Sequence, residues 1–421
     1  QERGKQVLQP KDIWYTAVSG IWQTVWLEPV PTLSISALIS IPEIDFNAVE
    51  VQVRLSTWDI PGDSRCEIDL LDNGEAVASA VWRDNEACVL VIPQPKLWSP
   101  DSPHLYDLRA RLYQGDALVD EVNSYTALRK FSLLRDADGH LRFALNDQPL
   151  FLYGPLDQGY FPDGLYTPPS EAAMLFDIEF TKAIGCNMIR KHVKVEPARW
   201  YYHCDRMGMI VWQDMPNGGL PDRMWQAVLA QTIGYRRIES RWQRRFGRHQ
   251  AENRSFYQEQ LRSMIDHLNP FVCIAVWVPF NESWGQFEAK AVAKLIHRLD
   301  KTRLVDHASG WYDMGGGDFV SKHIYFKKLK APRKDPRRAF VISEFGGYSL
   351  KVAGHVWDEK ERFGYRFYDT PEALTAAYQA LLEEELLPLI PEGLAPAIST
   401  QTRRPAAKSR RRRHPPEERT S

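Results

Sequence analysis

The sequence has no long hydrophobic run and almost no net charge, and each absence excludes a class of protein. No apolar stretch reaches the length of about 18 residues that a membrane-spanning helix needs. The 53 lysines and arginines nearly balance the 54 acidic residues, which gives a net charge of −1. A balanced charge predicts no general attraction to nucleic acid or to anionic membranes. We therefore expect neither of these as a partner.

Cysteine is also scarce, and its spacing predicts no metal site. The chain has five cysteines, an odd number, and no two of them form a CxxC pair. This spacing favours buried free thiols over structural zinc. The five are Cys66, Cys88, Cys186, Cys204 and Cys273.

The two ends lack features that are typical of complete chains. The sequence begins at Gln1, with neither an initiator methionine nor a signal peptide, so we expect a fragment or a processed product. Residues 402–421 carry eight lysines and arginines, two glutamates and almost no large apolar residue, which predicts a disordered basic tail. The compartment, cytoplasmic or periplasmic and secreted, stays open, and so does the oligomeric state.

The chain has 421 residues, 44% of them hydrophobic, which allows two or three domains. The first of these shows the pattern of an all-β domain. Between residues 31 and 128, short stretches of alternating polar and apolar residues are separated by turn signals such as Asp72-Asn73-Gly74. Seven strands in about 95 residues predict an immunoglobulin-like β-sandwich. The expected strands are 33–40, 48–56, 66–71, 76–82, 87–92, 105–113 and 118–125.

From residue 129 to residue 401 the pattern becomes an alternation of strands and helices. Eight such units in about 270 residues predict a (β/α)8 barrel. A doubly wound sheet is the alternative, but it normally carries a glycine-rich phosphate loop after its first strand. Here the glycines 315–317 precede a strand, so we interpret them as a turn. The expected strands are 150–153, 187–190, 209–213, 272–278, 303–306, 319–323, 340–343 and 394–399, and the expected helices are 170–185, 222–267, 287–299 and 371–387.

Two glutamates follow apolar strands at equivalent places in this barrel. Residues 272–278 form one such strand, and Glu282 comes soon after it; Glu344 directly follows the strand that ends at Ser343. The carboxyl ends of barrel strands share one face, so we expect these side chains to lie near each other. Two carboxyls roughly 5 Å apart would suit retaining glycoside hydrolysis, with one as acid and the other as nucleophile. The plain alternative is that both are ordinary loop carboxylates.

At this point the chain resembles glycoside hydrolase family 2, the β-galactosidase, β-glucuronidase and β-mannosidase group. The resemblance rests on six stretches in the family's order, listed here: SGIWQTVWLEPV at 19–30, LWSPDSPHLY at 97–106, 187–190, CDRMGMIVWQDMP at 204–216, Asn281-Glu282 and 343–346. It implies a jelly-roll sugar-binding domain, then the sandwich, then the barrel. It also implies that Glu282 is the acid/base, that Glu344 is the nucleophile and that Asn281 binds the sugar 2-hydroxyl.

The resemblance assigns further site residues. It implies that Arg190 supports the nucleophile and that Tyr325 hydrogen-bonds to it. His192 stands two residues after Arg190, where the family has a histidine at three, and for His192 and His323 a structural role is as well supported as sugar contact.

For two more candidate site residues, two roles stay open. Trp284 is a candidate subsite wall or a core residue, and Asp214 is a candidate hydroxyl ligand or half of an ion pair. The metal ligands of some family members have no match, so we predict no metal and no other cofactor.

Both ends depart from the family pattern. Residues 1–30 correspond only to the exit of the jelly-roll domain, with 23–27 as a candidate strand, and the helix that should follow the eighth barrel strand is missing. Net charge changes from −7 before residue 402 to +6 after it, so we hypothesise a frame shift or a truncated gene call near residue 401. We also expect the missing helix to leave apolar faces of the barrel exposed.

The sequence thus predicts an exo-acting retaining β-glycosidase, most similar to β-galactosidases, with a carbohydrate substrate. The alternative is a non-catalytic carbohydrate-binding fragment of such an enzyme. A nucleic-acid contact through the basic tail is a third hypothesis, but no aromatic residues are interleaved with the four consecutive arginines.

Overall fold

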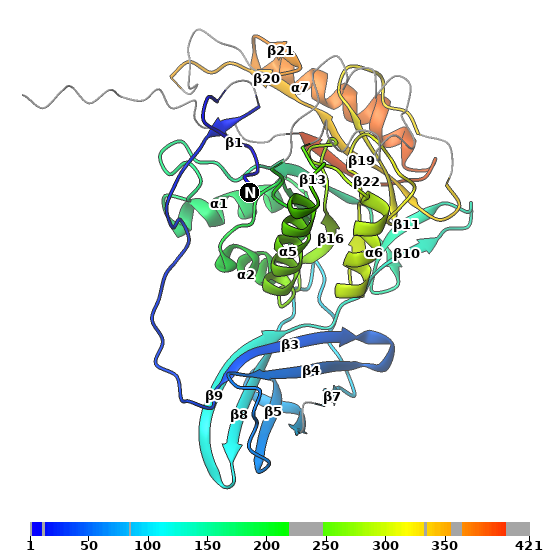
Figure 1. Ribbon diagram of the computed structural model, residues 1–421. Coiled ribbons are helices and arrows are strands. Elements are labelled where there is room, and N and C mark those ends of the chain that lie inside the picture. Colours follow the sequence, from blue (N-terminus) through cyan, green and yellow to red (C-terminus); the bar gives the residue numbers. More distant parts are fainter. Residues whose placement is uncertain are drawn as a thin grey trace, which may run out of the picture.

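A computed structural model of the protein describes residues 2–10, 13–83, 86–218, 247–331, 335–354 and 364–400. Figure 1 shows two folded units, a β-sandwich below and an α/β barrel above it. This order confirms the predicted fold class, a sandwich followed by a (β/α)8 barrel. The bounds assigned to each domain stay a prediction, and so does the jelly-roll origin of residues 1–30. The basic tail, 402–421, lies outside the described residues.

The sandwich consists of two antiparallel sheets, and all seven expected strands are present. One sheet has the order β3-β4-β7 and the other β6-β5-β8-β9. In β4, Val49, Val51 and Val53 are buried between the sheets while the intervening Glu50 and Gln52 are partly exposed, as alternation predicts. The strands are β3 (Ile35–Glu43), β4 (Ala48–Leu55), β5 (Ser64–Asp72), β6 (Glu75–Trp82), β7 (Cys88–Val91), β8 (Tyr106–Gln114) and β9 (Ala117–Thr126).

The barrel has all eight expected strands, and every pair of hydrogen-bonded neighbours is parallel. The sheet runs β17-β16-β15-β14-β13-β22-β19-β18. Its two end strands meet where the Asp318 amide donates to the Val305 carbonyl at 2.8 Å, which nearly closes the barrel. The strands are β13 (Leu152–Asp157), β14 (Met188–Lys191), β15 (Ile210–Asp214), β16 (Ile274–Val278), β17 (Leu304–Val305), β18 (Phe319–Ile324), β19 (Ala339–Gly346) and β22 (Leu394–Thr400).

Helices lie on the outside of these strands (Figure 1). The Ser170 side chain caps α1 by accepting from the Ala173 amide at 3.1 Å, as its position predicted. Of the predicted helix 222–267, residues 222–246 lie outside the described residues, and the remainder contains α5. The sequence reading missed α2. The helices are α1 (Glu171–Ala183), α2 (Ala198–Met207), α5 (Ala251–Leu268), α6 (Ala289–Leu299) and α7 (Pro371–Ala380), and α7 continues as a π-helix, Leu381–Leu386, and a 3₁₀ turn, Leu387–Leu389. No described helix is long and apolar enough to cross a membrane.

Smaller strands join these units. A hairpin sheet, β10 (Phe131–Arg135), β11 (Leu141–Leu145) and β12 (Gln148–Pro149), precedes the barrel, and β20 (Tyr348–Leu350) pairs with β21 (Arg366–Tyr368) beside α7. Two short N-terminal strands, β1 (Gln6–Val7) and β2 (Tyr15–Thr16), pair in parallel.

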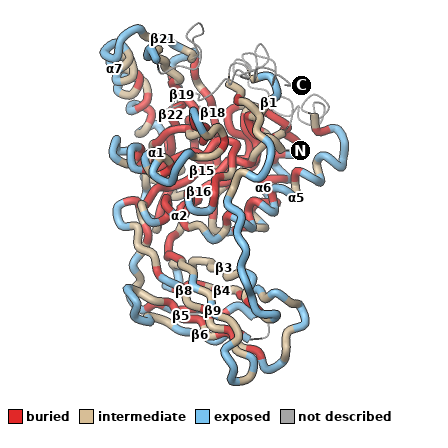
Figure 2. The backbone as a smooth tube through the Cα atoms, turned by 90° about the vertical axis from the view of Figure 1, so that its left-hand side faces the viewer, coloured by how far each residue is buried: buried red, intermediate tan, exposed pale blue. Residues whose placement is uncertain are grey.

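The strand expected at 23–27 was a wrong prediction. These residues form no strand and pair with no described strand; they lie in the link between the two units, and residues 24–27 are exposed and drawn pale blue in Figure 2. Leu27 is fully exposed and Trp26 is 71% exposed. An apolar sequence forms a stable strand only where a neighbouring strand and a core are present to receive it.

The two units are joined through a buried aspartate at the end of α2. Trp98, wholly buried, donates its indole N–H to the Asp205 carbonyl at 2.7 Å. Tyr125 donates its hydroxyl to the Asp205 carboxylate at 2.7 Å, and that carboxylate also accepts the Cys273 amide at 2.7 Å. Burial raises the pKa of Asp205 to about 6. The sandwich is therefore joined to the barrel by two aromatic side chains, Trp98 and Tyr125, that donate hydrogen bonds to Asp205.

Trp98→Ala should destabilise the chain by about 3–5 kcal/mol, because it opens a cavity at the junction and removes the hydrogen bond to Asp205. Chemical denaturation followed by circular dichroism measures this loss. The matched control is Trp58→Ala, since Trp58 is 99% exposed and its removal should change stability by less than about 0.5 kcal/mol. Equal effects of the two substitutions would contradict the junction described here.

Candidate active site

The structure brings the two predicted glutamates together at the carboxyl ends of the barrel strands. Glu282 follows β16, and Glu344 lies near the end of β19. One carboxylate oxygen of each and a ring nitrogen of His323 all lie within 4.8 Å of one another. The two side chains thus face a single small gap, as their positions after apolar strands predicted.

His323, on β18, contacts both glutamates. Its Nδ1 lies 2.8 Å from Glu282 Oε1 and its Nε2 lies 3.5 Å from Glu344 Oε1. Gly310 packs closely against the ring, where an added Cβ would stand only 2.7 Å from His323 Nδ1. Burial lowers the pKa of His323 to about 4, so the imidazole is neutral at neutral pH.

The backbone at Glu282 has an uncommon conformation. Glu282 and Ser283 both have positive φ values, 49° and 66°. Consecutive left-handed residues other than glycine are costly and often occur at functional sites. The Glu282 amide donates to the Ser309 carbonyl at 2.9 Å, which ties this turn to the segment after β17. The Glu282 side chain that this turn carries is 12% exposed.

Glu344 is more enclosed than Glu282 and touches two strong donors. Its side chain is 5% exposed, Arg190 Nη1 lies 3.3 Å from Oε1, and the Tyr325 hydroxyl donates to Oε2. Burial raises the pKa of Glu344, and the charge of Glu282 acts in the same direction. His323, Arg190 and Tyr325 oppose that rise because they stabilise the carboxylate.

Arg190, on β14, uses all five N–H donors of its guanidinium and is wholly buried. Nε and Nη2 donate to the two carboxylate oxygens of Asp214, each at 3.0 Å. Nη2 also donates to Asn281 Oδ1 at 2.9 Å. Nη1 donates to the Ser343 carbonyl at 3.1 Å in addition to Glu344. One side chain therefore connects three strands and the turn that carries Glu282.

Asp214, at the end of β15, belongs to this network rather than to the cavity wall. Both of its oxygens accept from Arg190, and His192 Nδ1 lies 2.8 Å from Oδ2. Although burial acts to raise the pKa of Asp214, Arg190 and His192 outweigh it and hold that pKa below its usual value. Of the two roles expected for Asp214, the geometry supports the ion pair.

The remaining predicted residues lie nearby. His192 lines the cavity, and burial lowers its pKa to about 3, so it is neutral. Trp284 is 5% exposed and packs against Trp14, with ring centroids 4.9 Å apart, so its packing role is the one observed. Asn281 has a buried side-chain Nδ2 that finds no hydrogen-bond partner in the described part of the chain.

The cavity between the glutamates is narrow, and part of its wall was not predicted. Its volume of about 30 Å³ is about the space of one water, which is less than a sugar ring occupies. Lys5, Gln158 and Tyr365 line it and were missed. Gln158 directly follows β13, a position that could have signalled it; nothing in the local pattern marks Lys5 or Tyr365.

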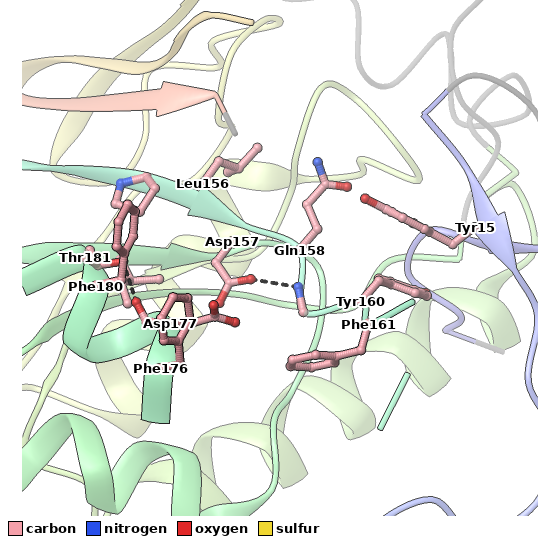
Figure 3. Close-up of a pocket in the computed structure, with 13 residues that line it drawn as sticks. Tyr15, Leu156, Asp157, Gln158, Tyr160, Phe161, Phe176, Asp177, Phe180 and Thr181 are labelled. Carbon is pink, nitrogen blue, oxygen red and sulfur yellow. Dashed lines mark hydrogen bonds between the residues drawn. The ribbon is translucent and has the colours of Figure 1, made fainter. Parts of the chain in front are cut away.

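A larger cavity of about 250 Å³ lies between α1 and β13. Figure 3 shows Phe176, Asp177 and Phe180 of α1 on one side of it and Tyr15 and Gln158 on the other. Phe176 is 57% exposed and Phe180 is 46% exposed, so this part of the first helix carries exposed aromatic side chains. The helix predicted to be missing would follow Thr400, outside the described residues. The two glutamates that face each other do not line this cavity.

Glu282, His323 and Glu344 are also, by residue type and spacing, a possible metal-binding set. The surroundings disfavour a cation, because the Arg190 guanidinium already contacts Glu344 and the Lys5 ammonium lines the same cavity. A divalent ion would stand beside two positive charges.

Arg190→Gln should cost about 3–5 kcal/mol of stability, because it leaves the buried charge of Asp214 uncompensated. The double variant Arg190→Gln, Asp214→Asn should recover a large part of that loss, since both charges are then gone. Urea denaturation of the two single variants and the double variant measures the coupling. Additive losses would show that the pair does not act as a unit.

Two family models together match most of the chain. Residues 32–129 match the model of glycosyl hydrolases family 2, and residues 169–368 match the family's TIM barrel domain. A β-galactosidase of Vibrio cholerae is 25% identical over 330 residues, which is 74% of this chain and 30% of that protein. A β-galactosidase of Leuconostoc mesenteroides is 31% identical over 238 residues, 55% of this chain and 20% of that protein.

Solved structures agree on the fold. A β-D-glucuronidase of Dictyoglomus thermophilum matches with a TM-score of 0.65 at 17% identity, over 88% of this chain and 62% of that one. A family member from Bacteroides cellulosilyticus matches with a TM-score of 0.61 at 19% identity, over 92% of this chain and 48% of that one. The chain spans less than a third of the length of the two relatives named above. Since the two family models follow each other in order over its sandwich and barrel, the chain belongs to glycosyl hydrolases family 2.

Proposed function

We propose that this chain carries the active site of an exo-acting retaining β-glycosidase that hydrolyses terminal β-linked sugars, of the β-galactosidase type. The observation that carries the proposal is the separation of the two carboxylates. Glu282 and Glu344 have oxygens within 4.8 Å of each other. Retaining enzymes need about 5–5.5 Å between the two carboxyls, whereas inverting enzymes need about 6.5–9.5 Å to admit a water. The relatives named β-galactosidase support the sugar class.

In the first step Glu344 acts as the nucleophile. Its carboxylate oxygen attacks the anomeric carbon while the bond from that carbon to the leaving oxygen breaks, and Glu282 gives its proton to that oxygen. The product of this step is a sugar joined covalently to Glu344. In the second step Glu282 takes a proton from water, the water oxygen bonds to the anomeric carbon, and the Glu344 ester breaks. The β-configuration is retained because each step inverts it once.

The contacts around the two carboxyls favour this division of roles. Arg190 and the Tyr325 hydroxyl both contact Glu344, so they stabilise its anionic form. Where two close carboxyls share one proton, that proton stays on the one with fewer stabilising donors, and we assign it to Glu282. Neutral His323 carries one N–H, on either Nδ1 or Nε2 according to its tautomer. Its Nδ1 can accept from protonated Glu282 in one tautomer and donate to ionised Glu282 in the other.

Asn281 provides a donor for the sugar. Arg190 Nη2 donates to Asn281 Oδ1 at 2.9 Å, and this contact fixes the orientation of the amide. Its Nδ2 is buried and has no partner in the described part of the chain. An unsatisfied buried donor costs about 1–3 kcal/mol, and a sugar hydroxyl would satisfy it. We assign this hydrogen bond to the 2-hydroxyl, where it would strengthen in the transition state.

Glu344→Gln should abolish hydrolysis of p-nitrophenyl β-D-galactoside, because the amide oxygen is a poor nucleophile. Glu282→Ala should lose about 10²–10⁴-fold in kcat/KM. Azide should restore turnover of Glu282→Ala only, since azide attacks the glycosyl-enzyme without general base help and yields the β-azide. Release of p-nitrophenol and NMR of the sugar product measure both effects.

The surface variant Glu259→Gln is the control for these substitutions, because Glu259 lies exposed on α5. Undiminished activity in Glu344→Gln would remove the assignment of the nucleophile. Binding of galactose with no turnover of any aryl β-glycoside by the unaltered chain would favour the non-catalytic alternative, which the narrow cavity keeps open.

Dialysis against EDTA should leave the rate of p-nitrophenyl β-D-galactoside hydrolysis unchanged, because no step above uses a metal. The measurement compares the dialysed chain with the same sample after addition of Mg²⁺. A loss of activity that Mg²⁺ reverses would contradict the expectation and would point to the Glu282, His323 and Glu344 cluster as its site.

A further inference from the structure

The N-terminal segment of the chain crosses the carboxyl-end face of the barrel and is anchored there. Glu2 pairs with the buried Arg248 at 2.7 Å. Gly4 packs so closely that a Cβ on it would stand 2.5 Å from the Val193 carbonyl oxygen. The Tyr15 amide donates to the Lys5 carbonyl at 2.9 Å, next to the short β1–β2 pair. These contacts, on both sides of Lys5, hold its backbone beside the site.

The Lys5 side chain reaches the cavity between the two glutamates. It is 6% exposed and lines that cavity. Its ammonium donates to Gln158 Oε1 at 3.0 Å and lies 5.7 Å from the centre of the Trp284 ring. Among the described residues that line the cavity it is the only lysine or arginine, and it forms no ion pair with any described carboxylate. An ammonium has three donors, so Lys5 retains capacity for a bound sugar.

The charges around Lys5 balance when the sugar is neutral. Lys5 and Arg190 are positive, Asp214 and Glu344 are negative, and Glu282 is uncharged while it serves as the acid. His192 and His323 are neutral because burial lowers their pKa values to about 3 and about 4. Burial also lowers the pKa of Lys5, to about 8, and the charge of Glu344 opposes this lowering, so the ammonium form prevails at pH 7. A sugar carboxylate would add an uncompensated negative charge to this buried set.

We propose that Lys5 is a specificity-determining residue: its ammonium binds a hydroxyl oxygen of an uncharged sugar, and its charge balances Glu344, so that the site accepts neutral β-glycosides in preference to uronides. This inference rests on the proposed glycosidase function. Residues of the barrel then carry out the chemistry, and the N-terminal segment contributes part of the substrate recognition. The two parts meet where Lys5 contacts Gln158, 153 residues later in the sequence.

The test compares Lys5→Met and Lys5→Arg with the unaltered 421-residue chain on p-nitrophenyl β-D-galactoside and p-nitrophenyl β-D-glucuronide. The unaltered chain should prefer the galactoside. Lys5→Met should lower kcat/KM for the galactoside about 10- to 100-fold, the loss of one hydrogen bond from a charged donor. Lys5→Arg should recover part of that loss because it keeps the charge. Lys96→Met is the control, since Lys96 lies on the sandwich surface.

Monodeoxy galactosides identify the contact directly. The deoxy sugar that lacks the bound hydroxyl should react about 10- to 100-fold more slowly with the unaltered chain, and Lys5→Met should add no further loss on that sugar. A residue with a purely structural role would instead lower activity on every deoxy sugar by the same factor. Thermal unfolding of each variant shows whether the fold is intact.

The outcomes distinguish a failure of the role proposed for Lys5 from a failure of the proposed glycosidase function. Preference of the unaltered chain for the glucuronide, with Lys5→Met losing only that substrate, would overturn the proposal and make Lys5 a carboxylate-binding residue. If the unaltered chain is active and Lys5→Met has the same kcat/KM as that chain on both substrates, Lys5 has no role in recognition. The proposed glycosidase function would be unaffected by that result. An unaltered chain that hydrolyses neither substrate would remove both.

Discussion

The site depends on one buried cation whose N–H donors are all hydrogen-bonded. Arg190 directs its five N–H groups to the carboxylates of Asp214 and Glu344, the Ser343 carbonyl and the Asn281 amide oxygen. Charges enclosed at this depth are tolerable only when they are paired and fully hydrogen-bonded. The same bonds set the relative positions of β14, β15, β19 and the turn after β16. A change that weakens this network should therefore also change the distance between the two glutamates.

The strands and the pair of facing glutamates were predictable because local sequence determines them. Barrel strands buried on both faces appear as short apolar runs, and a carboxylate that follows such a run must stand at one common face, as Glu282 and Glu344 do. Asp214 was predictable as a residue of the site but not in its role. Its partner could be identified only once β14 and β15 were seen to lie side by side.

The parts that could not be predicted depend on contacts distant in sequence. Residues 23–27 have the composition of a strand, yet they lie exposed because no described strand pairs with them. Lys5 and Tyr365 enter the cavity wall from outside the eight barrel strands, and neither follows an apolar run that would mark it. Nor does composition reveal that Trp284 packs against Trp14 rather than forming an open wall.

These differences divide the site into two parts that are held in different ways. The glutamates, Arg190 and His323 stand on or directly after strands of one continuous parallel sheet, so the barrel itself sets their geometry. Lys5 lies outside that sheet and is held by the β1–β2 pair, by the Glu2–Arg248 ion pair and by its own hydrogen bond to Gln158. Substitutions in the N-terminal segment should therefore change the wall of the cavity without disturbing the spacing of the two carboxyls, which depends on contacts within the barrel.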